Sequence, residues 1–403
     1  MNTTTIEDTQ VRLIASAKSW IDGEAMRQLH AAAKLPGVRL AVGLPDLHPG
    51  KGTPVGAAFV SEGVIYPHLI GGDIGCGMAL FKTDLLRRKA KLDRWSEVRF
   101  DLEHPWEGDT RERLAREGLC TVQFADSFGT IGGGNHFAEL QAVEKVFDQD
   151  AFARLDLAKD KLVALIHSGS RGLGQSVFEI YIEGHGGNGA HAESDAATSY
   201  LLLHDHAVTW AKASRALIAE RFVGAIGGAS KLVLDSCHNA IACRSRREET
   251  QASQATASAS ADGPNQSLVT SAPTSLWLHR KGAAPSDRGP LVIPGSRGTF
   301  SYLVQPVGDQ SANAWSVAHG AGRKWMRSES RQRVRERFHR DELVQTPLGG
   351  RVICEERALL YEEAPMAYKN IETVIADLVE AGLVSVIATL RPLLTYKARK
   401  ERR

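Results

Sequence analysis

The feature that most constrains the fold of this chain is a glycine-dense run, Gly-Gly-Asp-Ile-Gly-Cys-Gly-Met, at residues 71–78. It joins two apolar segments and places an acid, Asp73, three residues before a thiol, Cys76. Glycine tolerates positive φ, so the run predicts a tight turn whose backbone can approach an ion or a phosphate closely. A carboxylate beside a single thiolate is unusual for structural zinc, but it suits a site where the thiolate bridges two metals. On this run alone, a glycine turn around a buried cysteine is an equally good interpretation.

Length and composition indicate an ordinary globular protein. The 403 residues can bury a large core; 43% are hydrophobic, 24% are charged, and the net charge is +2. No apolar run approaches the length of a membrane span, and the N-terminal residues carry acids rather than the hydrophobic core of a signal peptide. The five scattered cysteines are odd in number, which favours a reducing compartment. We therefore expect a cytoplasmic protein with no membrane partner and, over residues 1–403, a single domain.

Apolar periodicity and turn residues divide the chain into strands and helices. The expected strands are residues 38–42, 55–60, 77–82, 162–166, 232–234, 291–293 and 300–304. The expected helices are residues 107–118, 195–222 and 371–380. Residues 11–35 are expected to form a strand followed by a helix, which stops at a Pro-Gly pair. The chain shows no internal repeat.

Residues 248–275 differ in composition from the rest of the chain. They are rich in Ser, Ala, Thr and Gln, and they lack a sustained apolar pattern. Such a segment has little to bury, so we expect a mobile surface loop within the domain. A boundary between two domains is the competing interpretation.

Three histidines lie at the ends of strands or beside glycine turns: His136, His167 and His238. A lone histidine is more often a hydrogen-bonded core residue than a metal ligand. Three of them, together with the acid and the thiol of the glycine run, favour a two-metal site of imidazole, carboxylate and thiolate ligands. The cysteine that precedes His238 is left out of this set, because neighbouring residues on a strand point to opposite faces.

A fourth histidine, His319, lies in the small-residue loop Ala-His-Gly-Ala-Gly-Arg. Small neighbours leave room for a phosphate ligand, and we expect Arg323 to hold its oxygens. A neutral imidazole can attack phosphorus and form a phosphoramidate, so His319 is a candidate nucleophile. A plain glycine turn is the alternative. Two further loops, residues 294–299 and 279–283, have the composition of phosphate cradles, although each motif alone is weak.

Basic residues cluster in two stretches although the net charge is near zero. Residues 322–340 hold eight Lys or Arg against two Glu, and residues 397–403 hold five against one. A solvated helix face explains many such stretches. Two of them, one directly after the loop of His319, favour a polyanionic partner.

Taken together, these blocks resemble the RtcB family of RNA ligases. The matching stretches run in order through nearly the whole chain. They are residues 45–48, 50–52, 73–78, 132–139, 167–174, 238–239, 279–283, 294–301, 319–323, 363–365, 367–369 and 391–392. The resemblance implies an α+β fold in which mixed β-sheets pack with helices around a central metal and nucleotide cleft.

The resemblance also implies an activity and a metal site. The family joins an RNA 3′-phosphate or 2′,3′-cyclic phosphate to a 5′-hydroxyl, using GTP and manganese. By position, Asp73, Cys76 and His136 would hold one of two manganese ions. The other would be held by Cys76, His167 and His238, with Cys76 as the bridge.

The nucleotide site is likewise implied by position. His319 aligns with the histidine that becomes guanylylated in the family. The implied guanylate contacts are Asn135, His136, Phe137, Ala138, Glu139, His238, Asn239, Pro294, Gly295, Ser296, Arg297, Ser301, His319, Gly320, Ala321, Gly322 and Lys397.

Within the family the chain is most similar to the branch coupled to release factor H. The indications are the segment 284–290, Arg297 where general members carry methionine, and a Lys-Trp pair at 324–325. That branch is linked with mending nicked RNA of the translation machinery, which implies RNA repair and a functional link to a release-factor-like protein. Ser214, in place of a usual Asn, and the long segment 248–275 are further departures. None of them removes an implied ligand or the nucleophile.

Two alternative functions stay open. A metal-dependent cyclic phosphodiesterase that does not ligate would need the metal ligands but not His319. A non-catalytic RNA-binding partner of a release factor would need only the basic stretches. Of the three, a GTP-dependent ligase alone forms a covalent adduct with GTP.

Overall fold

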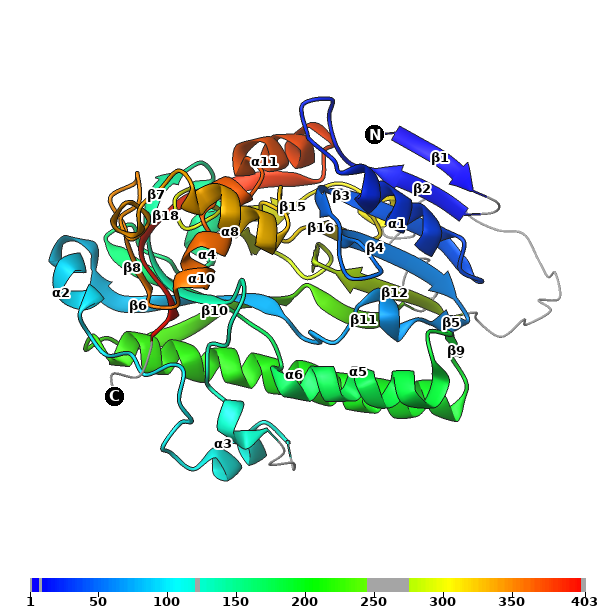
Figure 1. The fold of residues 1–403 in the computed structure, drawn as a ribbon, viewed down its shortest axis with the longest axis horizontal. Helices are drawn as coiled ribbons and strands as arrows, with labels where there is room; N and C mark the ends of the chain where they lie inside the picture. The colour runs from blue at the N-terminus through cyan, green and yellow to red at the C-terminus, as the bar shows by residue number, and fades with distance from the viewer. Residues whose placement is uncertain (1, 7–8, 120–123, 245–274, 400–403) are drawn as a thin grey trace, which may run out of the picture.

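Two β-sheets form the centre of the molecule (Figure 1). The computed structural model describes residues 2–6, 9–119, 124–244 and 275–399. Across the first sheet the strands lie in the order β1 (Asn2–Ile6), β2 (Thr9–Leu13), β3 (Val38–His48), β4 (Val55–Glu62), β12 (Leu276–Lys281) and β11 (Asn239–Arg244). β2 and β3 run parallel, and the other neighbouring pairs are antiparallel.

The second sheet contains most of the strands that lead to the candidate site. Its order is β10 (Ser230–Cys237), β6 (Gly77–Leu86), β8 (Lys161–Ser168), β7 (Phe137–Val146), β18 (Val384–Ala398), β15 (Ser301–Pro306) and β14 (Leu291–Ile293). β17 (Arg351–Cys354) pairs with β18 in parallel. Two small ribbons complete the strands: β13 (Ala283–Pro285) with β16 (Ser316–Ala318), and β5 (Val64–Ile65) with β9 (Ala190–His191).

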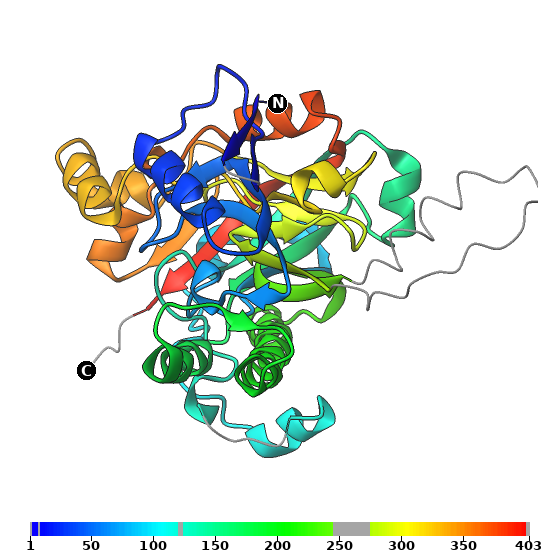
Figure 2. The same ribbon diagram turned by 90° about the vertical axis from the view of Figure 1, so that its right-hand side faces the viewer.

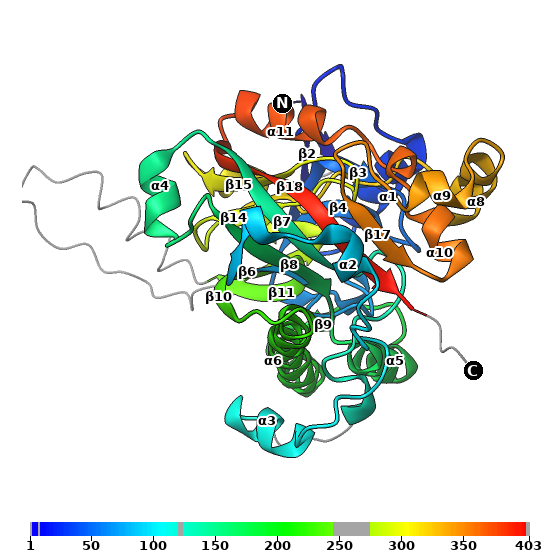
Figure 3. The ribbon, with the colours of Figure 1, turned by 90° about the vertical axis from the view of Figure 1, so that its left-hand side faces the viewer.

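Helices pack around the two sheets. They are α1 (Gly23–Ala33), α2 (Leu92–Ser96), α3 (Thr110–Arg116), α4 (Gln149–Arg154), α5 (Gly172–His185), α6 (Asp195–Gly224), α8 (Arg327–Arg335), α9 (Arg340–Leu343), α10 (Arg357–Glu362) and α11 (Ile371–Glu380). α5 and α6 lie side by side beneath the strands and are seen nearly end on in Figures 2 and 3. On another side, α8, α9 and α10 gather beside β17 (Figure 3).

Local sequence accounts for the helix bounds. The Ser194 side chain accepts a hydrogen bond from the backbone N–H of Ala197 and so caps the start of α6. Asn370 caps α11 in the same way, by accepting from the N–H of Glu372. α11 buries apolar side chains at the spacing of an amphipathic helix, namely Ile371, Val374, Ile375 and Leu378.

The register of the second sheet brings distant parts of the chain together. β6 and β7 both pair with β8, so that Met78 and Phe137 lie opposite His167 on its two sides. β10 pairs with β6 and places Cys237 opposite Gly77. Because these neighbours are antiparallel, the starts of β6 and β7 and the ends of β8 and β10 meet at one edge.

A single residue, His238, separates β10 in the second sheet from β11 in the first. Its backbone N–H donates to the carbonyl of Cys76 at 2.8 Å, and its carbonyl accepts from the N–H of Ala283 at 3.1 Å. Backbone bonds in both directions hold the residue where the chain crosses between the sheets. His238 therefore lies at the junction of the two sheets.

The predicted α+β class is confirmed, and so are most predicted elements. β14 and α11 have the predicted bounds, whereas β7, α5 and β18 were not predicted. Of the predicted loop at 248–275, residues 248–274 lie outside the described part of the chain. Among the helices of the described ranges, none is both long and apolar enough to cross a membrane.

Candidate metal centre and nucleophile

The glycine run forms a tight turn directly before β6. Gly75 has φ +75°, and a Cβ there would lie 2.9 Å from the Cβ of Ala211 on α6. A Cβ on Gly77 would lie 2.5 Å from the carbonyl oxygen of Ser236 on β10. A side chain at either position would push the turn away from its neighbours. The glycines thus allow the turn to hold Cys76 against β8 and β10.

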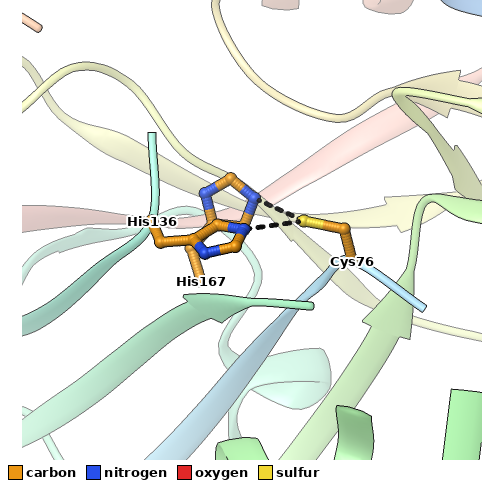
Figure 4. A group of neighbouring side chains, drawn as sticks. All are labelled: Cys76, His136 and His167. Carbon is orange, nitrogen blue, oxygen red and sulfur yellow. Dashed lines mark hydrogen bonds between the residues drawn. The ribbon is translucent and has the colours of Figure 1, made fainter. Parts of the chain in front are cut away.

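Three buried donor atoms converge beside this turn (Figure 4). The sulfur of Cys76 lies 3.5 Å from Nε2 of His136 and 3.3 Å from Nε2 of His167. All three donor atoms lie within 4.8 Å of one another. They come from the turn before β6, the residue before β7 and the end of β8, so sheet register assembles them.

Backbone carbonyls orient both imidazoles. Nδ1 of His136 bonds to the carbonyl oxygen of Ile131 at 3.2 Å, and Nδ1 of His167 bonds to that of Asn135 at 3.1 Å. A carbonyl can only accept, so each Nδ1 carries the proton and each Nε2 presents a lone pair toward Cys76. Outer partners of this kind commonly fix histidine ligands for a metal.

The two other predicted ligands each lie beside one histidine of this trio. Oδ2 of Asp73 lies 3.7 Å from Nε2 of His136. The ring of His238 is 5.2 Å, centre to centre, from the ring of His167. The structure therefore brings all five predicted ligands together, with Cys76 central. The imidazole and thiolate donors are buried, whereas the Asp73 side chain is 46% exposed. Such a mixture of carboxylate, imidazole and thiolate donors suits divalent transition metals.

Burial and mutual proximity shift the ionisation of these groups. Burial and neighbouring histidines hold the pKa values of His167 and His238 well below the usual range, so both rings are neutral ligands at neutral pH. Burial would raise the pKa of Asp73, but the neighbouring His136, Cys76 and Arg171 together outweigh it and lower that pKa. Burial and the Asp73 carboxylate raise the pKa of the Cys76 thiol. A bound cation would favour its thiolate form, which couples metal binding to proton release.

His319 lies beside the candidate metal ligands and is oriented by a buried acid. Its Nδ1 is 2.6 Å from Oδ2 of Asp46, and its backbone N–H donates to the same oxygen at 3.1 Å. Asp46 is fully buried near the end of β3. Its carboxylate retains the proton on Nδ1 and leaves a free lone pair on Nε2 of His319, as a candidate nucleophile requires. The His319 ring centre is 4.7 Å from that of His238, next to the metal ligands.

The small residues after His319 serve close packing. Gly322 has φ +72°, and a Cβ there would lie 2.3 Å from the carbonyl oxygen of Asp46. Arg323, which was expected to hold phosphate oxygens, has a different role. Its guanidinium donates to Glu363 Oε1 at 3.0 Å, to Ser330 Oγ at 3.1 Å and to two backbone carbonyls. Arg323 therefore anchors the loop to the protein, and the expectation for it was wrong.

The predicted guanylate contacts lie along the adjoining strand ends. Gln141 links two of them by donating to Glu139 Oε1 at 2.5 Å and to Ser301 Oγ at 2.9 Å. Lys397, near the end of β18, places its Nζ 5.9 Å from the ring centre of Phe137. The turn Pro294-Gly295-Ser296-Arg297 follows β14 and precedes β15.

The side-chain amide of Asn239 is engaged within the protein through both of its polar atoms. Its amide nitrogen donates to the carbonyl of Asp73 at 3.1 Å. Its amide oxygen accepts from the N–H of Gly282 at 2.7 Å. The amide thus braces the metal-binding turn against the loop after β12.

Sequence reasoning also missed Arg171, which follows the strand of His167. Arg171 adopts φ +59°, an uncommon conformation for a residue with a side chain, and its buried Nε lacks a partner in the described chain. Its positive charge contributes to the lowered pKa of Asp73. The sequence contains the Ser-Gly-Ser-Arg-Gly loop, but it does not show that this loop approaches the candidate metal ligands.

Comparisons with known proteins identify the family of this chain. A family model described as "tRNA-splicing ligase RtcB" matches residues 28–118 and 107–398. The chain is 43% identical over 384 residues to a protein named RNA-splicing ligase RtcB2 of Escherichia coli, covering 95% of this chain and 94% of the relative. It is 28% identical over 457 residues to the tRNA-splicing ligase RtcB of Thermococcus kodakarensis, covering 91% and 90% of the two chains. It is also 28% identical over 453 residues to the RNA-splicing ligase RtcB of Mycobacterium tuberculosis, covering 91% and 99%. The extent of these matches shows that the chain belongs to the RtcB family.

Proposed function

We propose that this protein is an RNA ligase that joins a 3′-phosphate or 2′,3′-cyclic phosphate end to a 5′-hydroxyl end, using GTP and manganese. Family membership and the names of the relatives support ligation of RNA. The single observation that carries the proposal is His319, whose Nδ1 is held by buried Asp46 beside the donor cluster. A nucleophilic imidazole next to metal ligands is the arrangement that nucleotidyl transfer needs.

The first step is guanylylation of the protein. Nε2 of His319 attacks the α-phosphorus of GTP; a P–N bond forms, a P–O bond breaks, and pyrophosphate leaves. Asp46 keeps the proton on Nδ1 and stabilises the positive ring as the bond forms. Two manganese ions, held by Asp73, Cys76, His136, His167 and His238, would neutralise charge on the reacting phosphates.

The next steps transfer GMP and join the RNA. An oxygen of the RNA 3′-phosphate attacks the phosphorus on His319, so GMP moves to the RNA end and the imidazole is released. The 5′-hydroxyl then attacks the activated 3′-phosphate, a phosphodiester bond forms, and GMP leaves. Arg171, beside Asp73 and with an unpartnered buried Nε, is placed to orient the RNA phosphate.

The proposed guanylate site extends from His319 to the second sheet. Asn135, His136, Phe137, Ala138 and Glu139 line it at the start of β7. Its remaining members are His238, Asn239, Pro294, Gly295, Ser296, Arg297, Ser301, Gly320, Ala321, Gly322 and Lys397. Asn239 would act through its neighbours, because its own amide is engaged.

We also propose a role in RNA repair, a cytoplasmic location and a functional link to a release-factor-like protein. The release-factor link is supported by the 284–290 segment and by Arg297, and the location by the odd number of scattered cysteines. Residues 1–403 would act as one domain, which is supported by a site that draws on both sheets.

A radiolabelled adduct tests the proposal. Wild-type protein incubated with α-labelled GTP and manganese should form an acid-labile covalent adduct and should seal RNA ends. The His319→Ala variant should form none but should still bind metal, whereas the matched control His191→Ala, at the exposed residue of β9, should label normally. Opening of cyclic phosphates without an adduct would favour the phosphodiesterase, and RNA binding without either reaction would favour a non-catalytic partner.

A further inference from the structure

Arg215, on α6, is a fully buried charged side chain next to the candidate metal centre. An arginine guanidinium has five N–H donors in a rigid, planar arrangement. All five have partners here, namely two backbone carbonyls, both oxygens of one carboxylate and one thiol. Nη1 donates to the carbonyls of Gly75 and Ser168, each at 2.7 Å. Nε and Nη2 donate to Asp235 at 3.0 and 2.7 Å, and Nη2 also donates to Sγ of Cys237 at 3.2 Å.

Three of these partners are the chain neighbours of candidate metal ligands. The two carbonyls belong to the residue before Cys76 and the residue after His167. The thiol belongs to the residue before His238. These partners lie in the turn before β6, at the end of β8 and at the end of β10. One side chain therefore contacts, at the same time, the segments that carry three of the five candidate ligands.

Cys237 shows how the arginine stays clear of the ligand positions. Successive side chains along an extended chain point to opposite faces. Sγ of Cys237 bonds to Arg215 on α6, whereas the ring of the next residue, His238, lies 5.2 Å from that of His167. The guanidinium therefore holds this segment without taking a ligand's place.

The guanidinium is itself held in place. Ala211, one helical turn earlier on α6, packs so closely that a Cβ on Gly75 would lie 2.9 Å from its own Cβ. The carboxylate of Asp235, whose side chain is 9% exposed, pairs with the guanidinium through both oxygens. Burial would lower the pKa of Arg215, but Asp235 and Cys237 outweigh it and raise that pKa, so the group is charged.

Packing alone does not account for an arginine at this position. Apolar residues of similar volume often stabilise a protein as well as a buried ion pair does. What apolar residues cannot supply is a set of directed donors to several segments. Lysine offers three donors on a flexible stem, fewer than the partners present here.

We propose that Arg215 is a positioning residue, which holds the turn before β6, the end of β8 and the end of β10 at the spacing that metal binding needs. This inference rests on the metal site of the proposed function. Arg215 contacts no candidate donor atom of that site in its printed hydrogen bonds, so it acts through the backbone and through Cys237. Outer contacts that orient ligands commonly control metal affinity.

Titration of the metal-free protein with cobalt(II) tests this role. Cobalt replaces other divalent ions, and a thiolate ligand gives it an intense charge-transfer absorption. Arg215→Met and Arg215→Lys should bind cobalt roughly tenfold to hundredfold more weakly than wild type, the usual range when an outer partner of a ligand is lost. At saturating cobalt their thiolate absorption should be weaker or shifted, because Cys76 no longer meets the two histidines in the same geometry.

A matched control separates positioning from stability. Arg399 also donates to several backbone carbonyls, those of Ser96, Glu97 and Val98, and none of these residues neighbours a candidate ligand. Arg399→Met should lower the melting temperature but leave cobalt affinity and absorption unchanged. Each titration is run well below the melting temperature of the variant, so that lost stability alone does not alter binding. The lysine variant serves if Arg215→Met does not fold.

The possible outcomes distinguish this inference from the proposed function. If folded Arg215→Met or Arg215→Lys binds cobalt with wild-type affinity and absorption, Arg215 only packs and the inference is overturned. An equal loss of affinity in Arg399→Met would also overturn it, because the effect would then be general. If wild type binds no cobalt, the proposed metal site fails and the inference fails with it. If wild type binds cobalt and the Arg215 variants do not, but GTP forms no adduct, the proposed function fails while the positioning role stands.

Discussion

Asp46 determines which nitrogen of His319 carries a proton. The acid is fully buried and binds both Nδ1 and the backbone N–H of His319 through one oxygen. Asp46→Asn keeps the shape but removes the charge that holds the proton and stabilises the positive ring. We expect guanylylation to slow by about two to four orders of magnitude, as when an orienting acid is lost from a catalytic triad. Single-turnover labelling at saturating GTP measures the rate; manganese binding should not change. A near-wild-type rate would show that the acid is only structural.

We predict that Glu139, as a proposed guanylate contact, makes nucleotide binding depend on pH. Burial raises its pKa to about 7, so the carboxyl is largely neutral at pH 6 and largely ionised at pH 8. Only the ionised form accepts from both guanine donors, so GMP affinity should rise as pH increases through 7. The pH dependence should be weaker in Glu139→Gln, which cannot ionise. Calorimetric titrations of both proteins from pH 6 to 8 measure the difference, since ionisation of the ligand is common to both.

The sequence predicted single residues well where the signal was local. His136, His167 and His238 stand beside glycine turns or strand ends, and the structure brings them to Cys76. The role of Arg323 could not be predicted, because its main acidic partner, Glu363, lies 40 residues further along the chain. Local sequence also could not show that Asp46 contacts His319, because the two residues are 273 positions apart in the chain.

At the scale of elements, α8 offers a candidate RNA-binding face near the site. A Cβ on Gly134 would lie 2.9 Å from Nη2 of Arg327, so α8 begins beside the loop of His136. Arg331 and Arg335 line one groove on the helix. Arg333 is less available, because it pairs with Glu329 at 2.5 Å. Arg331 also approaches an acid, Glu362, but at the longer distance of 3.8 Å. Arg331 and Arg335 are therefore chosen because both line the groove.

Neutralising these two arginines should weaken RNA binding in a salt-dependent way. In Arg331→Gln with Arg335→Gln, the slope of log K against log salt should fall by about 0.7 for each lost contact to single-stranded RNA. Guanylylation should be spared, because GTP is bound elsewhere. The matched control replaces Arg113 and Arg116 by Gln on α3, which lies far from α8 (Figure 1). An unchanged RNA slope in the α8 variant would mean that the helix face is merely solvated.

β18 and β7 were not predicted, because each contains residues that are unusual in a buried strand. β18 contains Pro392, which normally argues against a central strand; the sheet accommodates it with a register shift between Pro392 and Leu394. β7 carries Glu139 and Gln141, buried polar residues that break the apolar pattern because they face the candidate nucleotide site. α11 and β14 were predicted correctly, because their apolar patterns serve only packing.

At the scale of the whole molecule, the site lies where the two sheets meet. Asp46 comes from the first sheet, and Cys76 and His167 lie at the edge of the second. His238 joins the two sheets directly. Neither sheet alone contains both the nucleophile's partner and the metal donors. Binding of metal should therefore stabilise the junction as well as the site.

This coupling predicts that manganese raises the melting temperature of the metal-free protein. A ligand that binds only the folded state stabilises it by about 2.7 kcal/mol at a hundredfold excess over its Kd. Cys76→Ser should lose most of the rise, since a hydroxyl is a poor anionic bridge at neutral pH, and it should lose sealing activity too. His319→Ala should keep the rise, because the nucleophile is not a ligand. Scanning calorimetry with and without manganese measures the rise in melting temperature, and a parallel metal analysis measures the number of ions bound per chain. If Cys76→Ser retained two ions per chain and the full rise, the thiolate would not be the bridge; if His319→Ala lost the rise, that histidine would be a ligand and not the nucleophile.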